Sequence, residues 1–286
     1  MITAPDLVAS CGTLRRASFP DRVAAAAQAG FRGIGLTTTE YRNLHAYGWT
    51  DAQMRKVLER FGISLVEAEF IVGFWLEPGP ANLPERPGLV YADPESERAL
   101  FRMADEFGVN VMQAVGTFDS RPLGSEVAEG FGALCDRAAP HGLTVALEFV
   151  PYTSIPTLES AQKVVVDAGR ANGGLCFDTW HFFRGGGAVE QLALIDSATV
   201  KMVQVNDGPA IPTDPNRMVD AVSNRLCPGE GDFPLADCLR ELWSVGVDVP
   251  LSVEVFSLDL ERLPSRAIAE RAASGTRAVM AGAGIA

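Results

Sequence analysis

Helix-forming stretches alternate with short apolar stretches along almost the whole chain of 286 residues, and this alternation constrains the fold strongly. A helix is predicted over 21–30, where consecutive alanines favour it and Gly30 ends it, and the alternating apolar residues of 31–36 predict a strand. The same patterns predict further helices over 51–61, 93–107, 126–139, 158–168, 189–195, 235–245 and 264–280. They predict further strands over 6–10, 63–70, 109–115, 143–150, 174–179, 200–205 and 250–256.

The predicted strands are short and mostly apolar, as is typical of parallel strands covered by helices. Eight strands, most of them followed by a helix, favour one α/β domain over residues 1–286, a single (β/α)8 TIM barrel. A doubly wound open sheet is the alternative. Such a sheet is expected to carry a glycine-rich phosphate turn after its first strand, and the sequence has no GxGxxG motif.

The charge and the cysteines exclude several classes of protein. The 36 acidic residues outnumber the 24 Lys and Arg, and the net charge of −12 argues against a nucleic-acid partner or an anionic membrane surface. The five cysteines show no CxxC spacing, so neither a zinc knuckle nor a disulfide framework is indicated. With no signal-peptide pattern and no long apolar run, we expect a cytoplasmic protein.

Polar side chains near the ends of four consecutive predicted strands point to a site. Glu148, Asp178, Gln204 and Glu254 each lie in an otherwise apolar stretch. In a barrel these side chains converge at one end, where three carboxylates need a positive partner. A divalent metal fits this need, and the oxygen-rich set favours Mg²⁺ or Mn²⁺ over Zn²⁺. For any one of these residues taken alone, an ion pair or a backbone hydrogen bond is the simpler interpretation.

Two long segments add to this picture. Residues 73–94 and 207–234 follow the third and seventh predicted strands and are rich in proline. Both leave the carboxyl ends of strands, where barrels place their active sites, so we expect both to be functional.

Over nearly its whole length, and most specifically from 143 to 256, the chain resembles the xylose-isomerase-like TIM barrel superfamily, the sugar phosphate isomerases and epimerases. Ketose 3-epimerases, inosose dehydratases and dehydroshikimate dehydratases belong to it. Members carry Glu, Asp-x-x-His, His and Glu on their last four strands, which is similar to Glu148, Asp178 with His181, Gln204 and Glu254 here. Gln204 departs from the usual His. Arg225 precedes a Pro-Gly-x-Gly turn, as in the family.

The resemblance implies a divalent-metal-dependent isomerase or epimerase that acts on a sugar-like hydroxy-ketone through an enediolate. Glu148 and Glu254 would transfer protons, and His181 and Arg225 would bind substrate oxygens. A metal-dependent lyase or dehydratase acting on a keto-polyol or a related cyclic substrate is the alternative. The partner expected is a small polyhydroxy molecule, and the sequence is compatible with a homo-oligomer.

Two further hypotheses about the function have less support from the sequence. An endonuclease like the abasic-site enzymes of this barrel needs a His-rich site and a basic face, which three histidines and a charge of −12 disfavour. A non-catalytic binding barrel is disfavoured because all four candidate ligands are present. His181, between two aromatic residues, is also compatible with a structural histidine.

Overall fold

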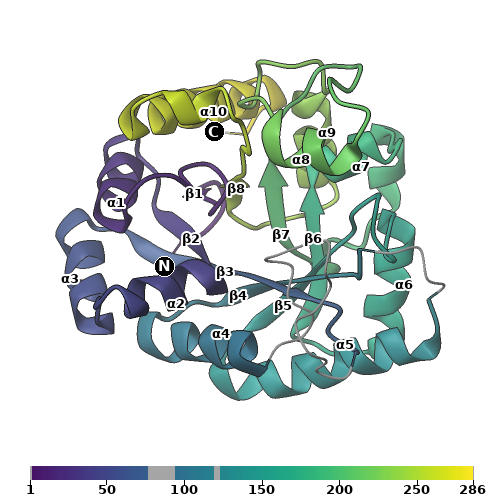
Figure 1. Ribbon diagram of the computed structural model, residues 1–286. Helices are drawn as coiled ribbons and strands as arrows, with labels where there is room; N and C mark the ends of the chain where they lie inside the picture. The colour runs from purple at the N-terminus through teal and green to yellow at the C-terminus, as the bar shows by residue number, and fades with distance from the viewer. Residues whose placement is uncertain (1, 77–93, 119–122, 286) are drawn as a thin grey trace.

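The strands form a closed barrel of eight parallel strands in sequence order, and β1 pairs with β8 to close it (Figure 1). The computed structural model describes residues 2–76, 94–118 and 123–285. The strands are β1 (Leu7–Ala9), β2 (Gly33–Thr37), β3 (Ser64–Val72), β4 (Val111–Val115), β5 (Thr144–Glu148), β6 (Gly173–Asp178), β7 (Val200–Val205) and β8 (Leu251–Val253). The predicted (β/α)8 barrel is therefore confirmed, and the open sheet is wrong.

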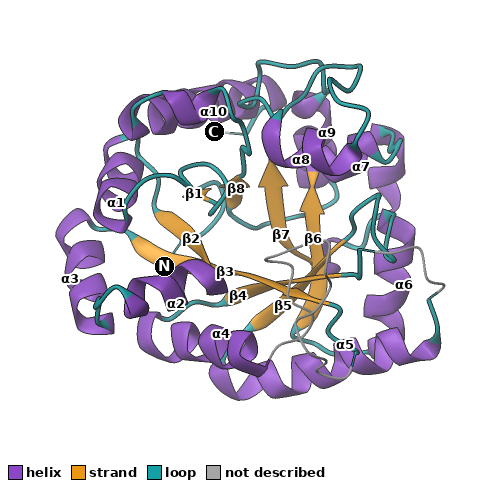
Figure 2. Cartoon of the chain, in the orientation of Figure 1, coloured by secondary structure: helices purple, strands orange, loops and turns teal. Residues whose placement is uncertain are grey.

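Helices surround the strands on the outside of the barrel (Figure 2). The α-helices are α1 (Phe19–Gln28), α2 (Thr38–Ala46), α3 (Asp51–Phe61), α4 (Pro94–Phe107), α5 (Ser125–Ala138), α6 (Leu158–Ala168), α7 (Thr179–Arg184), α8 (Arg217–Ser223), α9 (Leu235–Ser244) and α10 (Ser265–Ala283). Short 3₁₀ helices are η1 (Ala139–His141), η2 (Val189–Leu194), η3 (Ser197–Thr199) and η4 (Leu260–Arg262). In the part of the chain that the structure describes, no helix has the length and apolarity that a membrane span requires.

Several boundaries differ from the prediction for local reasons. Helix α1 begins before residue 21 because the Ser18 side chain caps it and Pro20 suits its first turn. The helix predicted over 189–195 is the 3₁₀ helix η2. Strand β8 ends at Val253, so Glu254 lies directly after the strand. The helix start predicted at Asp93 falls outside the described residues.

The apolar core lies mainly between the strands and the helices, and a smaller cluster fills the inside of the barrel. That inner cluster is made by Ala146, Cys176 and Met202, each two residues before a predicted site residue on its strand. Because side chains alternate along a strand, the side chains of Glu148, Asp178 and Gln204 also face inward. The strand pattern therefore places these polar groups at the carboxyl end of the barrel, next to the inner apolar cluster.

Candidate active site

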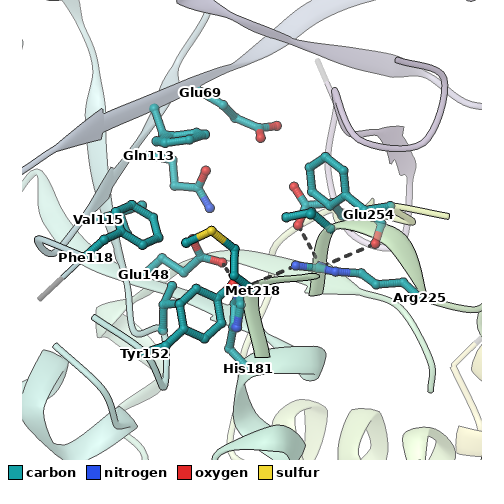
Figure 3. Close-up of a pocket in the computed structure, with 14 residues that line it drawn as sticks. Glu69, Gln113, Val115, Phe118, Glu148, Tyr152, His181, Met218, Arg225 and Glu254 are labelled. Atoms are coloured by element: carbon teal, nitrogen blue, oxygen red, sulfur yellow. Dashed lines mark hydrogen bonds and ion pairs between the residues drawn. The ribbon is translucent and has the colours of Figure 1, made fainter. Parts of the chain in front are cut away.

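A cavity of about 130 Å³ opens at the carboxyl end of the barrel (Figure 3). Of the residues predicted from the sequence, Glu148, His181, Arg225 and Glu254 line it. Asp178 and Gln204 are fully buried and contact those residues. Apolar walls come from several loops and strands, including Val115, Phe118, Tyr152, Met218 and Phe256. The structure thus brings all six predicted residues to one end of the barrel.

The strand register fixes the heights of these side chains. Asp178 on β6 pairs with Gln204 on β7, and Gln204 pairs with Ser252 on β8. Glu254 therefore lies two residues beyond the level of Gln204. Glu148 pairs with Cys176, so it lies one inward-facing step below Asp178. The four residues are therefore not at one level: Glu148 and Glu254 line the cavity, while Asp178 and Gln204 contact its lining residues.

Arg225 is the cation that joins two of the carboxylates. Its Nη1 lies 2.8 Å from Asp178 Oδ2 and 2.8 Å from Glu254 Oε2, and its Nε donates to the carbonyl of Ala221. Burial alone would raise the pKa of Asp178, but Arg225 and other neighbours outweigh it and hold the pKa below its usual range. For Glu254 burial dominates, and its pKa is raised despite Arg225. One positive charge thus serves two buried carboxyl groups.

Glu148 and His181 form a second, looser contact. His181 Nε2 lies 3.4 Å from Glu148 Oε1. Burial, together with Arg225, lowers the pKa of His181 to about 4, so the imidazole is neutral near pH 7. The pKa of Glu148 is raised well above its usual range by burial and then by the charges of Asp178 and Glu254. Glu148 is therefore a poorly compensated carboxyl group in contact with the cavity.

Both the nitrogen and the oxygen of the Gln204 side-chain amide form hydrogen bonds. Its Nε2 donates to Glu254 Oε1 over 2.9 Å, while its Oε1 accepts from Gln113 Nε2 over 3.2 Å. The Sγ of Cys176 also lies 3.3 Å from that oxygen. The amide nitrogen, and not the oxygen, therefore faces Glu254.

The donor set fits a divalent cation. Glu148, Asp178 and His181 offer ligand atoms that all lie within 4.8 Å of one another. The nitrogen of His181 that faces this group is Nε2, which lies 3.4 Å from Glu148 Oε1 and 4.0 Å from Asp178 Oδ2. Arg225 compensates Asp178 and Glu254 but makes no contact of hydrogen-bond length with Glu148. A cation at this end of the barrel would supply the missing charge.

Two polar residues of the cavity were missed by the sequence analysis. Glu69 in the second half of β3 and Gln113 on β4 both line it. For Glu69 the signal was present, because Glu67 and Glu69 interrupt the apolar run of 63–72 just as Glu148 interrupts its own strand. Gln113 gave no comparable signal, since one amide in a strand is ordinary.

Residues 23–279 match the family model described as xylose isomerase-like TIM barrel, and the chain belongs to this family. It is 30% identical to an inosose isomerase of Bacillus velezensis over 190 residues, which cover 64% of this chain and 66% of that protein. It is 26% identical to a 3-dehydroshikimate dehydratase of Pseudomonas aeruginosa over 267 residues, which cover 92% of this chain and 39% of that protein. The chain thus spans less than two thirds of the length of either relative.

Solved structures show the same fold. The IolI protein with a bound zinc atom superposes with a TM-score of 0.82 at 21% identity, over 96% of this chain and 98% of that one. The D-allulose 3-epimerase from Methylomonas sp. in complex with D-allulose gives a TM-score of 0.70 at 16% identity, over 97% and 98% of the two chains.

Proposed function

We propose that the protein is a divalent-metal-dependent isomerase or epimerase that acts on a sugar-like hydroxy-ketone through an enediolate. The observation that carries the proposal is the pair Glu148 and Glu254, two carboxyl groups that line one cavity from different sides (Figure 3). The inosose isomerase among the relatives and the D-allulose 3-epimerase among the similar structures support a sugar-like substrate.

Each residue of the cavity has a role in this chemistry. Glu148, whose pKa is raised by burial, is suited to take a proton from the carbon beside a carbonyl, and Glu254 to return one from the other side. The Arg225 guanidinium and the neutral His181 Nε2 face the cavity, where they can bind substrate oxygens and stabilise developing negative charge.

We assign the cation, Mg²⁺ or Mn²⁺ as the sequence predicts, to Glu148 and Asp178 together with His181, whose ligand atoms lie close to one another. The two other ligands predicted from the sequence fit less well, because Gln204 turns its amide nitrogen toward Glu254 and Glu254 already pairs with Arg225. When bound, the cation would supply Lewis acidity at the substrate oxygens. The oxygen-rich donors support a hard cation, and the zinc of the IolI structure supports a divalent one.

One observation favours the second candidate, a dehydratase or other lyase. Both oxygens of Glu254 already accept hydrogen bonds, from Gln204 at Oε1 and from Arg225 at Oε2, and the Ser10 hydroxyl, whose one proton can go to Glu254 or to Glu69, also lies 2.9 Å from Oε1. A carboxyl group held at both oxygens in this way is less free to return a proton to carbon than Glu148 is. The 3-dehydroshikimate dehydratase that aligns with 92% of this chain supports the same outcome.

The product formed in deuterated water decides between the two reactions. An isomerase or epimerase gives an isomer of unchanged formula that carries solvent deuterium, whereas a dehydratase gives a product that has lost water. The test uses mass spectrometry with D-allulose, an inosose and 3-dehydroshikimate as substrates. Glu148→Gln is expected to slow both turnover and deuterium exchange by about 10²–10⁴-fold. An isomeric product without deuterium would contradict the enediolate.

Metal dependence is tested on the same activity. Protein treated with EDTA and freed of chelator is expected to lose turnover and to recover it when Mg²⁺ or Mn²⁺ is added. Elemental analysis of protein purified without chelator identifies the native metal. Asp178→Asn is expected to weaken metal binding in calorimetry. Turnover that is indifferent to thorough chelation would show that the reaction needs no metal.

A further inference from the structure

Glu69 is a buried carboxyl group for which the fold supplies no cation. Its side chain is 2% exposed, and its hydrogen-bond partners are the Ser10 hydroxyl (3.1 Å), the Cys11 thiol (3.0 Å) and the Cys11 amide (3.5 Å). All three partners are neutral, and in the described residues no Lys, Arg or His forms an ion pair with it. Burying a carboxyl group in this way disfavours folding, so a structural role alone does not account for Glu69.

Strand β3 is built so that Glu69 reaches the cavity. Ala68 pairs with Met112 and Ile71 pairs with Ala114, so β3 advances by three residues while β4 advances by two. This bulge lets the consecutive residues Glu69 and Phe70 both line the cavity, whereas neighbours in a regular strand point to opposite faces.

Strand β2 leaves room for the same carboxyl group. A Cβ atom at Gly35 would lie only 3.0 Å from Glu69 Oε1. Any side chain larger than hydrogen at this position would crowd the Glu69 carboxyl, so the glycine permits the arrangement.

Glu69 is also held beside Glu254. The Ser10 hydroxyl lies 3.1 Å from Glu69 Oε1 and 2.9 Å from Glu254 Oε1, so one side chain links the two carboxyl groups. The second oxygen of Glu69, Oε2, contacts the Cys11 thiol, which is a weak donor. The Glu69 carboxyl group, which lines the cavity, therefore keeps the capacity to accept a stronger hydrogen bond from a molecule there.

We propose that Glu69 is a substrate-binding residue that accepts a hydrogen bond from a hydroxyl of a polyhydroxy ketone. The inference rests on the proposed function, because it takes the same cavity as the substrate site. Glu148 and His181 lie on one side of this cavity, and Glu69 lies on another side (Figure 3). The hydroxyl that Glu69 binds is therefore on a different part of the substrate from the atoms that contact Glu148.

Glu67 provides a matched control. It lies two residues earlier on β3, is buried, and has Ser252 as its hydrogen-bond partner, but it does not line the cavity. If buried carboxyl groups on β3 were needed only for the structure, replacing either residue would change substrate binding alike. If Glu69 contacts the substrate, only its replacement would change which hydroxyl groups the protein recognises.

The test compares the wild type with Glu69→Leu, Glu69→Gln, Glu67→Leu and Glu67→Gln. The substrates are D-allulose, an inosose and 3-dehydroshikimate, each with analogues that lack one hydroxyl. Affinity is measured by calorimetry and kcat/KM by turnover. In the wild type, removal of the hydroxyl that Glu69 binds is expected to weaken binding about 10- to 100-fold. In Glu69→Leu the same removal is expected to have no effect, and both Glu67 variants are expected to discriminate like the wild type.

The outcomes separate this inference from the proposed function. If the wild type binds a ketone and Glu69→Leu discriminates among its deoxy analogues as the wild type does, the role of Glu69 is wrong and the proposed function stands. If the wild type binds none of the ketones, the proposed function is wrong, and the assignment of Glu69 is wrong with it. Circular dichroism melting of each variant identifies any that fail to fold, and the Gln variants then carry the comparison.

Discussion

The buried carboxyl groups of this barrel differ in the partners that compensate them. Asp178 and Glu254 share Arg225, whereas Glu67 and Glu69 have neutral partners. Burial raises the pKa of Glu67 to about 8, against a partial lowering by the Ser252 hydroxyl. Glu67 is thus protonated in the folded protein at pH values where it is ionised in the unfolded chain.

This difference makes the contribution of Glu67 to stability depend on pH. The folded state binds the Glu67 proton more tightly than the unfolded chain does. The contribution of Glu67 to stability is therefore fully present below the unfolded pKa near 4.5 and is lost as the pH rises through about 8. Glu67→Gln removes the ionisation. We expect Glu67→Gln to gain stability relative to the wild type, so that its free energy of unfolding relative to the wild type is larger at pH 9 than at pH 5 by roughly 3 kcal/mol. Urea denaturation at both pH values measures it, and an equal difference at the two would contradict the prediction.

At this scale the sequence predicted the residues better than their contacts. Glu148, Asp178 and Glu254 were found because each interrupts an apolar strand, a signal that depends only on alternation. The pairing of Arg225 with Asp178 and Glu254 was not predicted. It depends on how the segment after β7 folds back, and this is set by contacts between residues distant in sequence.

Among the elements, the segment after β7 positions Arg225. The buried Asp207 carboxylate accepts four backbone hydrogen bonds, from the amides of Gly208, Phe233, Gly229 and Gly231. The backbone of Asp207 also exchanges two hydrogen bonds with Leu226, directly after Arg225. One side chain thus holds both ends of the segment that presents the guanidinium to the cavity.

Replacement of Asp207 tests this role. Asp207→Asn turns one acceptor oxygen into a donor that faces two amides, so we expect a loss of about 2–4 kcal/mol of stability and weaker substrate binding. Asp232→Asn is the control, because that exposed side chain accepts one backbone hydrogen bond, from Ala210, in the same segment. Thermal melting and calorimetric affinity are the measurements. If both variants behave alike, Asp207 has no special role.

The helices missed by the sequence analysis share one property. Helices α2, α7 and α8 follow polar capping residues, namely Thr37, Asp178 and Asn216, and have nine residues or fewer. Short helices carry too few turns for an apolar period to be visible. In addition, Asp178 was interpreted only as a site residue, although its side chain also caps α7 through the amides of Trp180 and His181.

For the whole molecule, the alternation of helices and strands was sufficient to predict the barrel. Eight units favour closure, the missing GxGxxG motif disfavours the open sheet, and in a closed barrel the carboxyl ends of all strands lie at one end. The shape of the cavity could not be predicted, because its walls come from residues on several loops, including Tyr152 and Met218. Their positions depend on packing between distant segments, which no periodicity of the sequence records.

The pairing of β1 with β8 has a consequence for folding during synthesis on the ribosome. Ser10 leaves the ribosome 244 residues before Glu254, which it contacts in the folded protein. Until β8 emerges, the nascent sheet has two open edges, and Arg225 lacks one of its two carboxylate partners. The growing chain must therefore keep those edges from pairing with other chains until β8 has emerged, and the candidate active site is complete only after that point.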